Sequence, residues 1–181
     1  MTPTMRTLLV LALTTLLGLP LTPPSAHASH VSTPGRPTRF TWPLAPPHQV
    51  VRTFTPPATA YTAGHRGIDL AATPGTPILA AADAVVLHAG PVADRPVVSL
   101  LHAGGLRTTY EPVVAGVRPG QAVRRGEQIG TLREGHDGCP TEACLHWGAI
   151  RTTPPRSREY IDPLHLLTNG HVRLLPRRTN T

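Results

Sequence analysis

The stretch Gly64-His65-Arg66-Gly67-Ile68-Asp69-Leu70 places an imidazole and a carboxylate four residues apart in an apolar setting. Asp69 lies between Ile68 and Leu70, where the pattern predicts burial, and a buried carboxylate is costly unless a cation or donors compensate it. Residues i and i+4 point to the same face of a strand or a helical turn. We therefore expect His65 and Asp69 to bind one metal ion, and zinc would compensate the carboxylate well.

A third ligand is expected from the distant segment Leu145-His146-Trp147-Gly148. His146 is flanked by two apolar residues, and strand alternation sends its side chain to the opposite face from theirs. The alternative is that these histidines are ordinary surface or hydrogen-bonded residues, since the chain contains 10 His and the short His-x-x-x-Asp spacing is common. The two segments together favour a metal site.

Residues 1–28 are predicted to be a secretory signal peptide. Arg6 precedes an apolar run from Leu8 to Leu21 that is too short and ends in too much proline for a membrane span, and Ala26-His27-Ala28 has the small-x-small pattern of a cleavage site. Cleavage would leave 153 of the 181 residues, enough for one domain. We expect a secreted, extracellular or cell-wall protein with no membrane span after cleavage.

The chain is basic, and all of its 17 basic residues are Arg. Only Arg6 lies in the predicted leader, so 16 Arg face 10 acidic residues in the remainder, a net charge of +6. In an exported protein this favours anionic cell-wall polymers as partners. Nucleic acid is not expected, because aromatic residues make up only 4% and no basic stripe is interleaved with them. The sequence does not indicate an oligomeric state.

The rest of the chain is divided into a Pro-rich linker (29–41), a single domain (42–167) and a basic C-terminal tail (168–181). The domain consists of short β-like runs separated by Gly, Pro and Asp, and no stretch has the periodicity of a long amphipathic helix. An all-β domain is therefore expected. The predicted strands are 50–54, 67–71, 77–80, 84–89, 97–102, 107–110, 122–123, 128–132 and 145–150.

Two segments, 73–78 and 117–123, each contain a Pro-Gly turn followed by β-branched residues. This repetition predicts an antiparallel β sandwich that folds back on itself. Biotinyl and lipoyl carrier domains contain similar segments, but they need a lysine for attachment and this chain has none. That alternative is nearly excluded.

The two cysteines, Cys139 and Cys144, enclose a short loop. Export favours a disulfide between them, which would restrain only local structure, by about 2 kcal/mol on the loop-entropy model. A role as metal ligands is the alternative.

Several segments, taken in order, resemble the lysostaphin-like, LytM-type zinc metallopeptidases over about residues 42–167. The matching segments are HRGIDLAATPGTPILAAADAVVLHAG, VVSLLHAGGLRTTYEPV, VRPGQAVRRGEQIGTL, LHWGAIR and YIDPLHLL. The resemblance implies a duplicated-hybrid β fold with a groove floored by sheet, and cleavage of peptide bonds in bacterial peptidoglycan. Its zinc ligands, from an HxxxD motif and the second His of an HxH motif, are here His65, Asp69 and His146.

The chain departs from this family at both of the other catalytic histidines, whose positions hold Pro112 and Cys144. General acid–base and oxyanion groups each contribute factors of about 100 to 10,000, so their loss predicts weak or absent turnover. Glu111 and His136 are the candidate catalytic substitutes. Strand alternation would turn Glu111 away from the side of Pro112 unless the proline distorts the strand, and His136 belongs to a loop.

Three hypotheses follow. The first is a secreted zinc endopeptidase that acts on peptidoglycan peptides with substitute groups around the metal. The second is a non-catalytic cell-wall-binding or amidase-regulating module that keeps the zinc site. The third is a zinc-stabilised structural domain, which a three-ligand site with an open position fits less well than a closed four-ligand site. The retained metal ligands favour the first.

Overall fold

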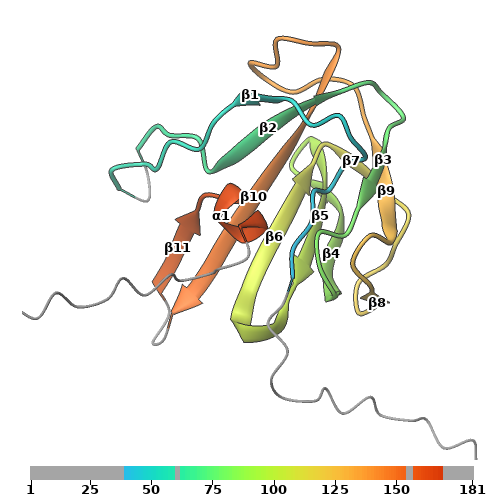
Figure 1. Cartoon of the computed structure of the whole chain (residues 1–181), viewed down its shortest axis with the longest axis vertical. Helices are drawn as coiled ribbons and strands as arrows, with labels where there is room; N and C mark the ends of the chain where they lie inside the picture. Colours follow the sequence, from blue (N-terminus) through green and yellow to red (C-terminus); the bar gives the residue numbers. More distant parts are fainter. Residues whose placement is uncertain (1–38, 60–61, 154–156, 169–181) are drawn as a thin grey trace, which may run out of the picture. The chain divides into compact units, whose positions relative to one another are not determined.

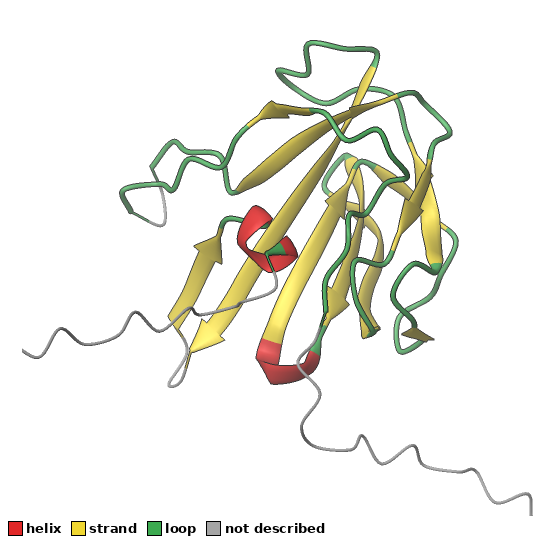
Figure 2. Ribbon diagram, in the orientation of Figure 1, coloured by secondary structure: helices red, strands yellow, loops and turns green. Residues whose placement is uncertain are grey.

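The computed structural model describes residues 39–59, 62–153 and 157–168. Within them, antiparallel strands form two sheets around one apolar core, and helix is confined to two short turns (Figures 1 and 2). The expected all-β, antiparallel sandwich is confirmed. The strands are β1 (Val50–Arg52), β2 (Gly67–Ala72), β3 (Pro77–Leu79), β4 (Ala84–Val92), β5 (Arg95–Leu101), β6 (Leu106–Glu111), β7 (Val113–Ala115), β8 (Ala122–Val123), β9 (Gln128–Leu132), β10 (Ala143–Thr153) and β11 (Ser157–Ile161); the helices are η1 (Ala103–Gly105) and α1 (Leu164–Leu167).

The larger sheet has the order β1-β2-β10-β6-β5-β4-β8, and β11 pairs with β10. β10 is the longest strand, at 11 residues. It runs between β2 and β6 (Figure 1) and pairs with both. Beyond Gly148, the last residue of β10 that pairs with β2, the far end of β10 pairs with β11 instead. The segments around Asp69 and His146, far apart in sequence, therefore lie side by side.

The smaller sheet has the order β3-β9-β7. The chain leaves the larger sheet where β6 ends at Glu111 and joins the smaller one at Val113. Pro112 lies at this transition, and proline cannot donate a ladder hydrogen bond. The sequence at Pro112 thus accounts for the end of β6.

Strand alternation separates the core from the opposite face of the larger sheet. Leu145 and Trp147 of β10 are fully buried in the core, paired with Leu70 and Ile68 of β2. His146 lies between them in sequence and points to the other face. The apolar positions of the two central strands thus fix which side of the sheet the polar residues occupy.

Four elements were not predicted from the sequence: β7, β11 and the short helices η1 and α1. β7 is only three residues long, and β11 contains charged residues without apolar alternation. The packed region also begins before Trp42, since Phe40 packs against the core and the Thr41 amide donates to the Ala81 carbonyl at 2.8 Å. The predicted signal peptide, nearly all of the linker, and tail residues 169–181 lie outside the described residues.

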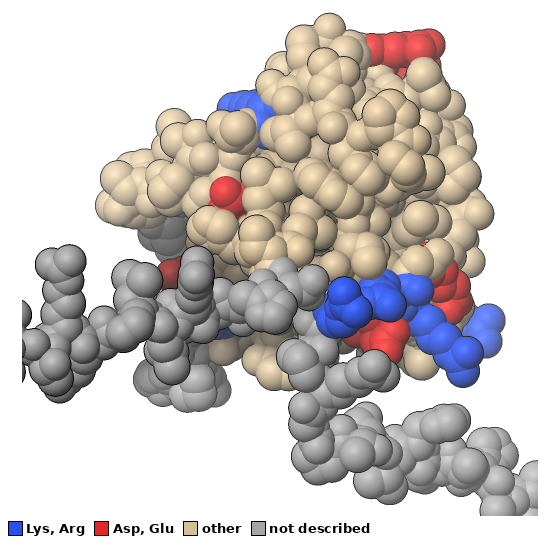
Figure 3. All heavy atoms as spheres, viewed as in Figure 1, with Lys and Arg blue, Asp and Glu red and all other residues tan. Residues whose placement is uncertain are grey.

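On the face shown in Figure 3, most of the surface is uncharged, and Arg side chains gather at its lower edge next to acidic ones. Among the described residues, no helix has the length and apolar character needed to cross a membrane.

Candidate metal centre

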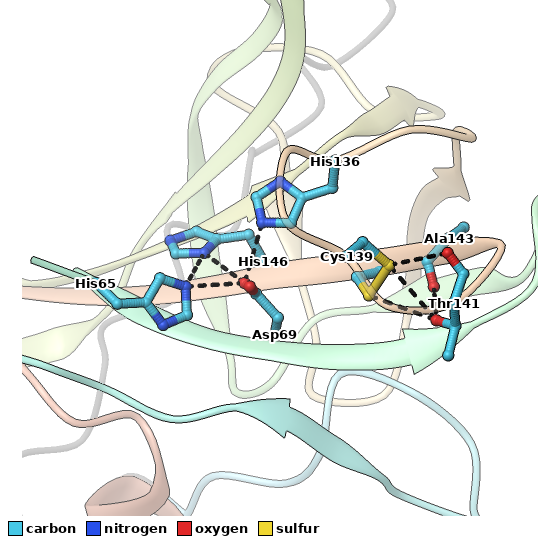
Figure 4. Close-up of a disulfide and its surroundings, with 8 residues drawn as sticks. His65, Asp69, His136, Cys139, Thr141, Ala143 and His146 are labelled. Atoms are coloured by element: carbon cyan, nitrogen blue, oxygen red, sulfur yellow. Dashed lines mark hydrogen bonds and ion pairs between the residues drawn. A yellow bond between two sulfur atoms is a disulfide. The ribbon is translucent and has the colours of Figure 1, made fainter.

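Four titratable side chains converge at one point on the larger sheet. They are His65, Asp69, His136 and His146, and one ligand-type atom from each lies within 4.8 Å of the others (Figure 4). Asp69 on β2 lies directly opposite His146 on β10. Because opposite residues of an antiparallel pair point to the same face, His146 Nδ1 comes within 2.8 Å of Asp69 Oδ1.

His65 lies two residues before β2, at an isolated bridge with Thr55. Its Nδ1 is 2.8 Å from the Thr53 carbonyl oxygen, which can only accept, so Nδ1 donates its proton there. A neutral ring then has a lone pair on Nε2, and Nε2 lies 2.9 Å from Asp69 Oδ1. A carbonyl that fixes the tautomer in this way is the usual arrangement behind a metal-binding histidine.

The ligand-type atoms of the cluster face one another without a complete set of hydrogen bonds. His65 Nε2 and His146 Nδ1 lie 3.1 Å apart, and both face Asp69 Oδ1. Within the described part of the chain, Asp69 Oδ2 and His136 Nε2 are buried and have no hydrogen-bond partner. Three imidazole nitrogens and one carboxylate are a donor set that zinc binds tetrahedrally. The residues therefore fit a zinc ion, which would compensate the converging lone pairs.

The electrostatics of the cluster keep Asp69 ionised. Burial alone would raise the pKa of its carboxyl, but the close approach of the His136 and His146 rings outweighs burial and holds this pKa well below its ordinary value of 3.8. The Asp69 carboxylate in turn raises the pKa of His136 above its ordinary value of 6.5, against the effect of burial. A ligating carboxylate must be deprotonated, and Asp69 meets that condition at neutral pH.

Gly67 makes room for the His146 ring, and Gly148 makes room for the Thr109 hydroxyl beside it. A Cβ at Gly67 would lie 2.7 Å from His146 Nε2 and 2.4 Å from the Trp147 carbonyl oxygen. A Cβ at Gly148 would lie 2.5 Å from Thr109 Oγ1. The space beside His146 therefore depends on Gly67, and Gly148 affects the site only through Thr109.

The cluster lies in a groove of about 760 Å³ whose floor is formed by β4, β5, β6 and β10. The predicted sheet-floored groove is present. Four arginines and two acidic side chains line it, namely Arg52, Arg66, Arg95, Arg107, Glu111 and Asp137. Apart from Asp69, the groove therefore has a positive balance of charge.

Glu111 faces this groove and lies directly opposite His146. Alternation counted from Pro112 predicted that Glu111 would turn away from the site. The structure differs because β6 ends at Glu111 and Pro112 belongs to the connection between the sheets. Arg95 Nη1 donates to Glu111 Oε1 at 2.6 Å, which fixes the carboxylate near the cluster.

The sequence named His136, a loop residue, as a candidate catalytic substitute. The structure brings it into the cluster, with Nε2 at 3.2 Å from Asp69 Oδ1. Cys139 and Cys144 form a disulfide with a Cα separation of 5.7 Å, so neither thiol is free to bind metal or transfer a proton. Pro112 has no proton to transfer, so both positions that hold the family's other histidines lack an acid–base group.

Residues 63–163 match the sequence profile of peptidase family M23. The uncharacterized protein Rv2891 of Mycobacterium tuberculosis (strain ATCC 25618 / H37Rv) is 53% identical over 139 residues, which are 77% of this chain and 55% of that protein. A zinc-containing peptidase from Vibrio cholerae is 27% identical with a TM-score of 0.50, over 61% of this chain and 36% of that chain. The catalytic domain of the antimicrobial peptidase lysostaphin from Staphylococcus simulans shares the fold, with 21% identity and a TM-score of 0.54 over 66% and 92% of the two chains.

The β fold and its histidine–aspartate cluster define a metallopeptidase-type domain. The chain belongs to peptidase family M23, and its predicted likeness to LytM-type members is confirmed. It spans about half the length of the curated relatives from Mycobacterium that it matches.

Proposed function

We propose that this chain binds one zinc ion through His65, Asp69 and His146 and, after export, acts as a slow endopeptidase on peptide bonds of bacterial cell-wall peptidoglycan. The observation that supports it most is the convergence of His65 Nε2, His146 Nδ1 and Asp69 Oδ1 within 3.1 Å of one another at the groove floor. A zinc ion bound there would supply Lewis acidity that polarises a peptide carbonyl and activates water.

Substrate binding and proton transfer would then depend on the residues of the chain. The groove would hold an extended peptide across β10 and β6, next to the cluster. Glu111, directly opposite His146, would take a proton from the attacking water and pass it to the leaving amine, as general bases do. Arg95 would keep the Glu111 carboxylate oriented toward the groove.

The groove also favours an anionic peptide, a class to which peptidoglycan stem peptides belong. Arg107 Nε and Ser99 Oγ are both buried, line the groove and, among the described residues, have no hydrogen-bond partner. An unpaired buried polar atom costs free energy, and a substrate carboxylate would pair with both donors. We infer that a carboxylate of the substrate lies over β5 and β6, beyond the metal.

A second candidate function is a non-catalytic cell-wall-binding or amidase-regulating module that keeps the zinc site. The absence of an acid–base side chain at Pro112 and at the disulfide-bonded Cys144 favours it. Both candidates predict zinc and binding to the cell wall, and they differ in turnover.

Digestion of purified peptidoglycan by the zinc-loaded chain separates the two, with released peptides identified by mass spectrometry. The endopeptidase predicts new amino termini that disappear for Asp69→Asn and persist for His165→Ala, whose exposed imidazole lies outside the groove. Co-sedimentation with the insoluble wall in the absence of any release would reject the endopeptidase and support the binding module.

A further inference from the structure

The loop that contains His136 has a turn built to hold this side chain over the metal centre. Gly135 and Gly138 adopt φ angles of +81° and +79°, a region accessible mainly to glycine. A Cβ at Gly135 would meet nothing within 4 Å, so the backbone conformation, and not packing, requires glycine there. The Cys139 amide donates to the His136 carbonyl at 3.0 Å and closes the turn.

The disulfide attaches this turn to the strand that holds the metal ligand. Cys139 directly follows the turn, and its partner Cys144 lies on β10 two residues before His146. Residues two apart on a strand share a face, so the bridge lies on the groove side of β10, next to the cluster (Figure 4). The bridge thus limits how far His136 can move from Asp69.

The His136 ring points at the same carboxylate as the other two imidazoles. Its Nε2 is buried, lies 3.2 Å from Asp69 Oδ1, and has no hydrogen bond of proper geometry among the described residues. This nitrogen lies within 4.8 Å of the ligand-type atoms of His65, Asp69 and His146. Coordination would satisfy the nitrogen, since zinc accepts imidazole ligands readily.

We propose that His136 is a fourth protein ligand of the metal, through Nε2, and that the Cys139–Cys144 disulfide holds it in place. This proposal rests on the proposed zinc site and adds to it. Zinc with four protein ligands is closed, whereas catalysis needs one open position. With His136 bound, the site is closed by three imidazoles and one carboxylate, which agrees with slow turnover.

Zinc K-edge X-ray absorption of the zinc-loaded chain tests the ligand assignment, because scattering from imidazole rings reports how many histidines bind the ion. We expect three imidazoles in the wild type and in His165→Ala, and two in His136→Ala. Two imidazoles in the wild type would overturn the proposal while leaving the three-ligand site standing. A wild type that binds no zinc would instead reject the proposed function.

Chelator competition gives a second readout that does not depend on activity. We expect the zinc dissociation constant of His136→Ala to rise by more than the roughly 10- to 100-fold that loss of an outer-shell partner costs. His165→Ala should leave it unchanged. An unchanged dissociation constant in His136→Ala would contradict a ligand role for His136.

The role of the disulfide is tested by a double-mutant cycle with Cys139→Ala/Cys144→Ala, which also removes thiolates that could bind zinc. The double substitution should weaken zinc binding when His136 is present. It should have no further effect in a chain that already carries His136→Ala, because the disulfide acts through His136. Equal weakening in both backgrounds would show that the disulfide acts independently of His136. The number of imidazoles that X-ray absorption finds in the wild type tests the ligand assignment even if a variant fails to fold.

Discussion

Glu111 and His146 lie directly opposite each other on β6 and β10, with both side chains on the groove face of the larger sheet. This relationship places a carboxylate beside the metal centre although the neighbouring Pro112 can transfer no proton. The arginine that binds it, Arg95, is itself part of the groove wall. The predictions for catalysis depend on this pair.

Glu111→Gln should lower the rate of peptidoglycan hydrolysis by about 100- to 10,000-fold, because an amide cannot accept the proton that a general base takes. Zinc content should stay the same, since Glu111 is not among the cluster residues. Glu159→Gln is the matched control, because Glu159 is exposed and lies outside the groove. Hydrolysis at the wild-type rate in Glu111→Gln would remove Glu111 from the mechanism.

Gly67→Ala should weaken zinc binding and destabilise the fold by about 1–3 kcal/mol, because its Cβ would overlap the His146 ring and the Trp147 carbonyl. Gly116→Ala is the control, since a Cβ there meets its nearest atom at 3.7 Å and its φ is not positive. Chelator competition and urea unfolding measure the two effects. Equal behaviour of the two variants would mean that the space beside His146 is not needed.

Arg107→Ala should raise KM for carboxylate-containing peptides while changing kcat little, because the guanidinium is expected to bind the substrate away from the reacting bond. Arg118→Ala, exposed and outside the groove, should leave both constants unchanged. Steady-state kinetics with peptides that differ only in amidation of one carboxylate would check this. An equal rise in KM for the acid and the amide peptides in Arg107→Ala would contradict carboxylate recognition.

Tyr110 should make the fold less stable in alkali. Burial raises the pKa of its phenol to about 12, from 10.0 in an exposed chain, despite the hydrogen bond from Thr108. Between these values the unfolded state loses its proton first, so stability falls as pH rises from 10 to 12.

Tyr110→Phe should lack this fall in stability between pH 10 and 12. The variant should also lose about 1–3 kcal/mol of stability at neutral pH, because the Ala81 amide and Thr108 lose their hydrogen-bond partner. Urea unfolding at several pH values measures both; identical slopes would refute the assignment.

The fold was predictable because the apolar alternation is strong in the central strands. Leu145 and Trp147 fix the orientation of β10, and with it the direction of His146. The short strand β7 and the charged strand β11 lack such a pattern, so only pairing with neighbouring strands identifies them.

His136 was a candidate site residue from the sequence, but its contact with Asp69 could not be predicted, because alternation does not apply in a loop. Its approach to Asp69 depends on two glycines with positive φ and on a disulfide that returns the chain to β10. The two glycines of the segment Gly135-His136-Asp137-Gly138 are typical of a tight turn. The direction of that turn is set by the tertiary structure.

Zinc content per chain, measured by mass spectrometry of metals after purification without added chelator, tests the central claim most directly. The account predicts one zinc per wild-type chain and per His165→Ala chain, and a loss of bound zinc in His146→Ala, which removes a ligand from the middle of β10. Equal zinc in the wild type and in His146→Ala would contradict the assignment of this cluster as the metal centre.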